Sequence, residues 1–347
     1  MVIVDSPRLI VGGVDTHRDV NVAAVVDMNG GLLGVESFRT TADGHKLLAS
    51  WMRGFGTIER VGVEGTGTYG ASVARHLARM AVTVIEVDRP NRQQRRRNGK
   101  SDQLDAIEAA RAALSGRCTG RAKSGDSFAE AIRALLVAKR SARSTRVRTI
   151  VQLRHLMFTA PDELRARLGG LTPIQLDNEA AKLRPGAGGD IVMHGIKTAA
   201  VILARRVQAL DAEIEAIDVQ LFPLVKDAAP GLLQIFGVGV DTAAVLIAAA
   251  GDNPQRIVSE GAWAMICGVA PMPVMSGKNQ NRYRLNSGGN RQANNALWRI
   301  VITRLGQHEP HTVAYMNRRL AEGKTKPEII RCLKRYVARE TFQALLR

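Results

Sequence analysis

Aromatic residues are scarce in this chain of 347 residues, at 4% of the composition, although hydrophobic residues make up 45%. The cores must therefore be built mainly from Ala, Val, Leu and Ile, and little aromatic surface remains on which unpaired bases could stack. This scarcity argues against a protein that binds single strands by stacking. The length allows a sizeable core and favours two or three domains.

Cysteines and long apolar runs are also few. Cys118, Cys267 and Cys332 are odd in number and widely scattered, so they form neither a disulfide framework nor a zinc pattern. No apolar run approaches the roughly 18 residues of a membrane span, and the start "MVIVDSPRLIVGG" lacks the basic region of a signal peptide. We therefore expect a soluble protein of the reducing cytoplasm, with no membrane partner.

Acidic residues are outnumbered by basic ones. The 49 Lys and Arg against 32 Asp and Glu give a formal charge of +17 and a pI near 10.6. Such an excess is typical of a protein that binds a polyanion, most simply nucleic acid. A basic surface without a partner is the alternative.

The first third of the chain alternates apolar runs with turns. The runs "RLIVGGVD", "VNVAAVVDM" and "LLGVESF" predict three strands in succession. A helix over "ADGHKLLASWM", a strand at "RVGVE", a helix over "YGASVARHLARM" and a strand at "VTVIEVD" follow. Three successive strands before the alternation predict an α/β fold with a mixed sheet of the ribonuclease-H or RuvC-like type, rather than a Rossmann order.

The middle of the chain, from about residue 128 to residue 225, is long and helical. Its pattern predicts two antiparallel helices, or a coiled coil, joined by a polar segment that holds "RPGAGGD". From Arg133 to Arg154 there are seven basic residues and no acidic one. Lys139, Arg143 and Arg146 share one helix face, and we predict that this face tracks a phosphate backbone. A solvated face is the alternative.

The last part of the chain is mostly helical too. "PGLLQIFGVGVDTAAVLIAAAGD" resembles a helix-hairpin-helix, whose turn at Gly237–Gly239 offers backbone N–H groups to a phosphate. An ordinary glycine turn between packed helices is the alternative. The predicted division of the chain is 1–122, 123–228 and 229–347.

Four acidic residues stand where a ribonuclease-H-like sheet would bring them together. Asp15 and Glu64 end the first and fourth strands, which are neighbours in such a sheet, and Asp102 and Asp105 share one face at the start of a helix. Converging carboxylates repel one another unless cations lie between them, and oxygen ligands suit Mg²⁺ or Mn²⁺. We predict a metal site for phosphoryl transfer on these four residues.

The glycines of "VGVEGTGTYG" allow a second interpretation. Gly65, Gly67 and Gly70 spell G-x-G-x-x-G, and Glu86 and Asp88 follow at about the distance of a ribose-binding acid, as in a nicotinamide enzyme. The three preceding strands and the positive charge oppose this. So does the basic run that follows Asp88, which is suited to nucleic-acid phosphates and contains Arg92, Arg95, Arg96, Arg97 and Lys100.

A serine is the second chemical candidate. Ser276 precedes Gly277 in the polar segment "VMSGKNQNRYRLNSGGNRQ" and can approach a phosphate closely, and Ser287 is a rival nearby. The basic residues around them that we predict to contact nucleic acid are Lys278, Arg282, Arg284 and Arg291.

Taken in order, "GVDTHRDVNVAAVVD", "VGVEGTGTYG", "VDRPNRQQRRRNGKSDQLDA" and "GVAPMPVMSGKNQNRYRLNSGGNRQANNALWR" resemble the signature segments of DEDD-type insertion-sequence transposases, also described as bridge-RNA-guided serine recombinases. The resemblance covers nearly the whole chain. It implies a RuvC-like domain, a coiled-coil region and a C-terminal transposase domain. Met275 stands where relatives often have a second serine, which leaves Ser276 as the one serine of the motif.

The resemblance implies roles and partners as well. Asp15, Glu64, Asp102 and Asp105 would be the DEDD metal ligands, and Ser276 would attack the DNA and hold it as a phosphoserine ester. Element and target DNA, a non-coding guide RNA and other copies of the chain, in a dimer or tetramer, would be its partners. The setting would be the nucleoid of a prokaryote.

Two other functions remain open from the sequence. A RuvC-like junction endonuclease would activate water on the same metals and leave Ser276 structural. A protein that only binds nucleic acid would carry the acids as remnants and cut nothing.

Overall fold

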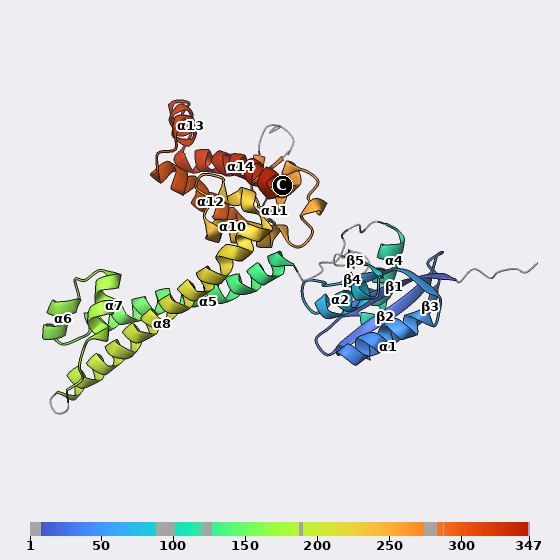
Figure 1. The fold of residues 1–347 in the computed structure, drawn as a ribbon, viewed down its shortest axis with the longest axis horizontal. Helices are drawn as coiled ribbons and strands as arrows, with labels where there is room; N and C mark the ends of the chain where they lie inside the picture. Colours follow the sequence, from blue (N-terminus) through green and yellow to red (C-terminus); the bar gives the residue numbers. More distant parts are fainter. Residues whose placement is uncertain are drawn as a thin grey trace, which may run out of the picture. The chain divides into compact units, whose positions relative to one another are not determined.

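The structure is a computed structural model that describes residues 8–87, 101–116, 118, 120, 127–186, 190–273, 283–286 and 288–345. The chain forms two compact units, Met1–Ser127 and Phe128–Arg347, each with its own hydrophobic core (Figure 1).

The first unit is built on one five-stranded sheet with the order β3-β2-β1-β4-β5. Its strands are β1 (Leu9–Thr16), β2 (Val20–Asp27), β3 (Leu32–Arg39), β4 (Thr57–Glu64) and β5 (Thr83–Val87). β1, β2 and β3 are antiparallel neighbours, whereas β4 runs parallel to both β1 and β5. The mixed sheet and the adjacency of the first and fourth strands are confirmed.

Helices cover both faces of this sheet. They are α1 (Ala42–Arg53), α2 (Ala71–Arg79) and α4 (Asp102–Leu114). Alternate residues of a strand point to opposite faces, so Val14 packs with α1 and α2, whereas its neighbours in β1 face α4. Because both faces are covered, β1 and β2 are buried along nearly their whole length.

The second unit begins with two long helices, α5 (Phe128–Phe158) and α8 (Ile191–Ala228), which run antiparallel along each other (Figure 1). The predicted pair of long helices is therefore present. Two short helices between them, α6 (Asp162–Leu168) and α7 (Pro173–Ala181), were not predicted. They form a small core with the end of α5 and the start of α8, which includes Leu153, Leu164 and Ala200.

The remaining elements of the second unit are short and mostly helical. They are α9 (Pro230–Leu233), α10 (Val240–Ala250), the 3₁₀ turn η1 (Pro254–Arg256), α11 (Glu260–Ile266), β6 (Pro271–Pro273), β7 (Tyr283–Leu285), α12 (Arg291–Gly306), α13 (Pro310–Ala321) and α14 (Lys326–Leu345). Between α9 and α10, the Gly239 N–H donates to Thr242 Oγ1 at 3.1 Å, so the predicted glycine turn uses this N–H to cap its own helix.

One core joins these elements to the base of the long helices. Trp263 is fully buried in it and donates through Nε1 to Thr341 Oγ1 at 3.1 Å. The same core includes Ile132 of α5 and Leu221 of α8. The predicted boundary at residue 228 therefore crosses a shared core, and the three-part division stays a prediction.

Candidate functional site

The pairing of β1 with β4 brings Asp15 and Glu64 to one edge of the sheet. The parallel register places Val14 opposite Val63, so Asp15 and Glu64 come next on the two strands and share a face. Across the strand ends, the Thr16 hydroxyl donates to the Glu64 carbonyl oxygen at 2.8 Å. The predicted neighbourhood of these two acids therefore follows from the sheet itself.

Two glycines let α4 lie directly against this face. A Cβ on Gly13 would overlap the backbone of Ala106 and Ala110, and one on Gly62 would overlap the backbone of Ala109. Gly13 and Gly62 are partners in the register of β1 and β4, so together they form a smooth patch under the helix. Close packing of α4 on this patch is what carries its first turn to the acidic edge.

That first turn supplies Asp102 and Asp105. Ser101 caps the helix, accepting a hydrogen bond from the Leu104 N–H at 3.2 Å. Asp105 is 6% exposed, as is Asp15, whereas the Asp102 side chain is 50% exposed. One carboxylate of the turn is therefore buried against the sheet, and the other is half exposed at its edge.

The electrostatics of Asp15 reflect this crowding. Burial raises the pKa of the Asp15 carboxyl, His17 lowers it in part, and the negative charges of Asp105 and Asp102 raise it further. A buried carboxyl beside two others is stabilised by protonation or by a cation. The donor set is carboxylate oxygen, which fits a hard divalent ion such as Mg²⁺ or Mn²⁺.

His17 belongs to the same group, and the sequence reasoning missed it. Its Nε2 lies 3.1 Å from Asp15 Oδ2 and 3.4 Å from Asp102 Oδ1. Ligand atoms of the three residues lie within 4.8 Å of one another. The clue was available, because His17 stands only two residues after Asp15, just past the end of β1.

The glycines of the G-x-G-x-x-G segment turn the chain after Glu64. Gly65 has φ +68 and its carbonyl accepts from the N–H groups of Thr68 and Gly70. A Cβ on Gly70 would approach the Glu64 carbonyl oxygen to 2.6 Å, whereas Gly67 has open space around it. The turn and the close approach account for Gly65 and Gly70 without a dinucleotide.

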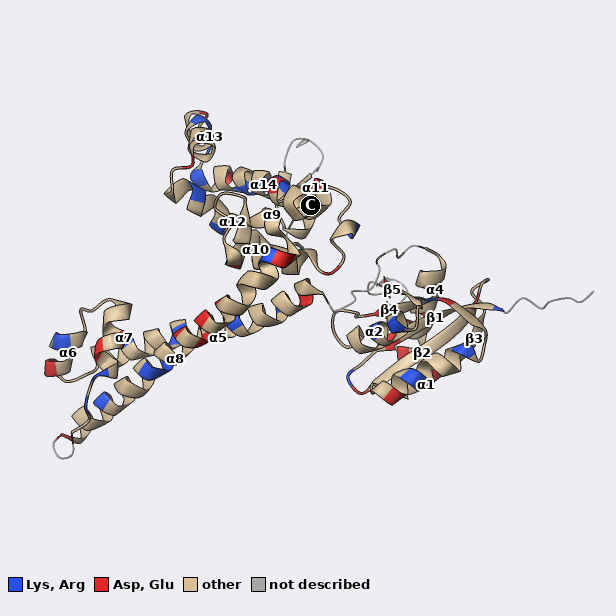
Figure 2. Cartoon of the chain, viewed as in Figure 1, with Lys and Arg blue, Asp and Glu red and all other residues tan. Residues whose placement is uncertain are grey.

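The positive charge on the predicted basic face of α5 is compensated by acidic residues of other helices. Carboxylates from α8 and α10 lie beside it (Figure 2): Lys139 pairs with Asp218 and Asp241, and Arg143 Nη2 lies 2.6 Å from Asp241. Arg146 pairs with Asp211 in the same way.

The Lys139 side chain is only 2% exposed, so its ammonium offers no surface to a phosphate. The prediction of Lys139 as a backbone contact is wrong on this geometry, because the neutralising acids come from other helices.

The other predicted residues divide into two groups. Arg284 lies in β7 and Arg291 begins α12, both exposed. The rest lie outside the described residues, and they are Arg92, Arg95, Arg96, Arg97, Lys100, Ser276, Lys278, Arg282 and the rival serine Ser287.

In the part of the chain that the structure describes, no helix is both long and apolar enough to cross a membrane.

Comparisons with known proteins match segments from both units to transposase families. Residues 12–160 match the family of DEDD transposases of the IS110 type, described as a transposase, and residues 229–317 match the transposase family named for IS116, IS110 and IS902. A similar protein is the insertion element IS110 uncharacterized 43.6 kDa protein of Streptomyces coelicolor, which is 30% identical over 159 residues. That similarity covers 46% of this chain and 38% of the relative.

Proposed function

Because this chain belongs to the IS110-type family of DEDD transposases, we propose that it cuts and rejoins DNA at the ends of an insertion sequence. The observation that carries the proposal is the acidic edge of the sheet, where Asp15 and Asp102 meet around His17 and Glu64 ends the neighbouring strand. Carboxylates gathered in this way suit divalent ions that act on phosphodiesters.

In this proposal Asp15, Glu64, Asp102 and Asp105 hold Mg²⁺ or Mn²⁺. When bound, the ion supplies Lewis acidity, polarising the scissile phosphate and stabilising the charge that develops on its oxygens. His17 orients Asp15 and Asp102 through its Nε2, since carboxylate oxygen suits these ions better than imidazole nitrogen.

Ser276 is the proposed nucleophile. Its Oγ attacks the phosphorus, and the new Oγ–P bond forms as the bond from phosphorus to a deoxyribose oxygen breaks. The serine hydroxyl gives up its proton, and the departing oxygen takes up a proton and leaves as a free hydroxyl. The phosphoserine ester keeps the energy of the broken bond, so a second DNA hydroxyl can reverse the step and rejoin the strand.

In this proposal, recognition of the DNA is divided between an RNA and the protein. A non-coding RNA of the element pairs with the DNA and selects the sequence, while the protein contacts backbone and shape. A net charge of +17 and an aromatic fraction of 4% support this, because many cations and few stacking groups suit backbone contacts. The active form is a dimer or tetramer, in which the acids of one copy act with Ser276 of another.

The second candidate is a metal-dependent junction endonuclease that activates water. It is favoured by one observation, namely that Asp15, His17 and Asp102 assemble within the first unit alone. In that case hydrolysis ends the reaction and no protein–DNA ester forms.

The deciding experiment uses labelled DNA that spans the joined element ends, RNA transcribed from the sequence flanking the gene, and Mg²⁺. Wild type, Ser276→Ala and the matched control Ser287→Ala are compared on a denaturing gel. We expect label attached to wild type and Ser287→Ala, and neither adduct nor cut strand with Ser276→Ala, although that variant still binds DNA. Equal cleavage by all three without an adduct would establish the endonuclease instead.

A further inference from the structure

A cavity of about 260 Å³ lies where α5, α10 and α12 meet in the second unit. Five of its lining residues are cations, and one, Asp241, is a carboxylate. The cations come from two helices that are far apart in the sequence, and they are Lys139, Arg140 and Arg143 of α5 and Arg291 and Arg299 of α12.

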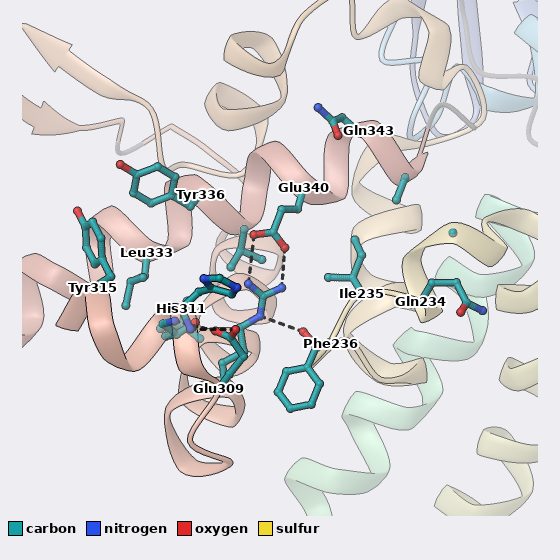
Figure 3. A pocket seen from close by; sticks show the side chains of 16 residues that line it. Gln234, Ile235, Phe236, Glu309, His311, Tyr315, Leu333, Tyr336, Glu340 and Gln343 are labelled. Carbon is teal, nitrogen blue, oxygen red and sulfur yellow. Dashed lines mark hydrogen bonds and ion pairs between the residues drawn. The ribbon is translucent and has the colours of Figure 1, made fainter. Parts of the chain in front are cut away.

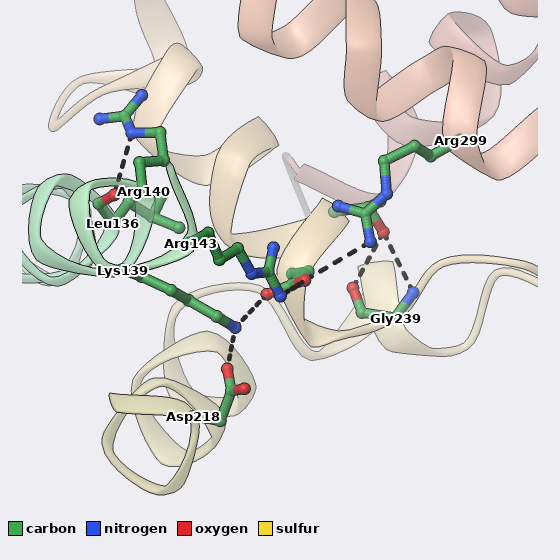
Figure 4. A network of polar contacts seen from close by, with 9 residues as sticks. Leu136, Lys139, Arg140, Arg143, Asp218, Gly239 and Arg299 are labelled. Carbon is green, nitrogen blue, oxygen red and sulfur yellow. Dashed lines mark hydrogen bonds and ion pairs between the residues drawn. The ribbon is translucent and has the colours of Figure 1, made fainter. Parts of the chain in front are cut away.

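Asp241 does not neutralise this lining, because it is already shared. It accepts from Lys139, and its Oδ2 lies 2.6 Å from Arg143 Nη2 and 3.4 Å from Arg299 Nη2. A second carboxylate of this network, Asp218 of α8, also pairs with Lys139 (Figure 4). Five cations thus face two carboxylates, and three positive charges remain.

The network has a buried base and an open rim. Lys139 is 2% exposed and forms the base, whereas the side chains of Arg143 and Arg299 are 44% and 43% exposed. The buried lysine holds Asp241 in place, and Asp241 in turn holds the two rim guanidinium groups. Arginines fixed in this way lose less side-chain entropy when an anion binds.

Arg140 and Arg291 line the cavity but take no part in the ion pairs of this network, so their positive charge stays uncompensated within it. Arg140 Nε donates to the Leu136 carbonyl at 2.9 Å, which anchors its guanidinium at the wall of the cavity. Among the described residues, neither Arg140 nor Arg291 forms an ion pair with a carboxylate. Gln292 and Asn295 of α12 add neutral amide donors to the same lining.

We propose that this cavity binds a backbone phosphate of a nucleic-acid strand. Arginine forks match the paired oxygens of a phosphodiester, and the amides beside them can donate to the same group. The cluster of like charges is destabilising when empty and is relieved by an anion. The site rests on the proposed function only for the identity of its ligand, which is DNA or RNA with the same phosphodiester chemistry.

The first test measures binding by fluorescence anisotropy in EDTA, with a short DNA duplex and a short RNA hairpin at several salt concentrations. Arg140→Gln and Arg291→Gln are compared with Arg206→Gln, which removes the same charge from an exposed position on α8 outside the cavity. We expect each cavity variant to bind several-fold more weakly and to reduce the salt slope by about 0.9 for duplex DNA. Arg206→Gln should behave as wild type.

The second test adds charge to the cavity without removing an arginine. Gln292→Glu places a carboxylate in the first turn of α12, where the helix dipole favours it, so the variant should be at least as stable as wild type. Its nucleic-acid affinity should nevertheless fall by at least about tenfold, because like charges repel. Gln255→Glu in η1, exposed and outside the cavity, is the matched control.

The outcomes separate the ligands. Losses confined to the DNA or to the RNA probe identify which strand the cavity holds. Unchanged affinity and salt slope for both probes overturn the proposal, and if sedimentation of Gln292→Glu then shows an altered oligomer, the cavity accepts an acidic side chain of a second copy. Because binding is measured without a divalent ion, failure of the proposed cleavage chemistry would leave this result unaffected.

A larger cavity of about 780 Å³ opens elsewhere in the second unit, beside Arg304, whose guanidinium pairs with Glu340 and donates to the Phe236 carbonyl (Figure 3). Here Arg304 is matched by Glu340, and Glu309 adds a second carboxylate to the lining. In the cavity between α5, α10 and α12, by contrast, the lining cations outnumber the carboxylates that pair with them.

Discussion

Asp15 in the first unit and Asp241 in the second are both aspartates with little exposed surface, yet their pKa values shift in opposite directions. Burial is the largest cause and raises the pKa of Asp15; His17 opposes the rise, and the charges of Asp105 and Asp102 add to it. Burial would also raise the pKa of Asp241, but hydrogen bonds and charges from Lys139 and Arg143 lower it to about 2.

The difference separates two uses of buried charge. Around Asp241 the protein supplies its own cations, so the carboxylate holds helices together. Around Asp15 the protein gathers further acids instead, which stabilises the fold less and prepares a place for an external cation. Clustering of charge of one sign, rather than burial alone, is the feature that the two proposed binding sites share.

The largest effect is expected from removing the base of the second network. Lys139→Met leaves Asp241 and Asp218 without their shared ammonium, and loss of one partner of a buried ion pair costs about 3–5 kcal/mol. Denaturation in guanidinium chloride measures this loss in the free energy of unfolding. Lys46→Met, which breaks the exposed pair with Asp43, should cost less than about 1 kcal/mol. Equal costs would mean that the Lys139 network is no more than a surface feature.

Asp15→Asn should act in the opposite sense on stability. It removes a carboxylate that burial and neighbouring charges disfavour, so thermal unfolding without metal should occur at the same or a higher temperature. Strand cleavage in Mg²⁺ should fall by about 10²–10³-fold, as when other groups that stabilise transition-state charge are removed. A variant that loses stability but keeps its cleavage rate would reverse the assignment of Asp15.

Gly13→Ala tests whether close packing of α4 carries the acids to the edge. The added methyl overlaps the backbone of Ala106 and Ala110, and overpacking costs about 1–3 kcal/mol. The affinity for a divalent ion, measured by calorimetry, should also fall, because Asp102 and Asp105 on α4 move away from Asp15 and Glu64. Gly67→Ala meets no atom within 4 Å and serves as the control for both measurements.

The smallest effect concerns pH. Asp241 has its pKa lowered from 3.8 to about 2, so its contribution to stability is fully present above about pH 4 and is lost as pH falls through 2. The shift corresponds to about 2 kcal/mol. The stability difference between wild type and Asp241→Asn should therefore shrink from pH 4 to pH 2. A difference that stays constant over this range would show that Asp241 is not held ionised by its partners.

Local patterns predicted much of the first unit. Runs of apolar residues located the five strands, and the order of three strands before the alternation indicated the mixed sheet that the structure shows. They failed where a short element depends on its neighbours, as with α6 and α7, whose apolar residues are buried only because α5 and α8 lie beside them. A capping box at Thr172 and Gln175, with Pro173 at the first helical position, was the local clue to α7.

By itself the sequence determined the five strands of the first unit, most of the longer helices, the acidic residues at their ends and the excess of basic charge, because these depend on local periodicity and composition. Tertiary structure alone decided which oppositely charged groups pair. It brought His17 to Asp15 and Asp102, and it turned Lys139 from a predicted phosphate contact into a buried partner of Asp218 and Asp241. The reason is physical, since the state of a charged side chain is set by charges from other elements within a few ångströms.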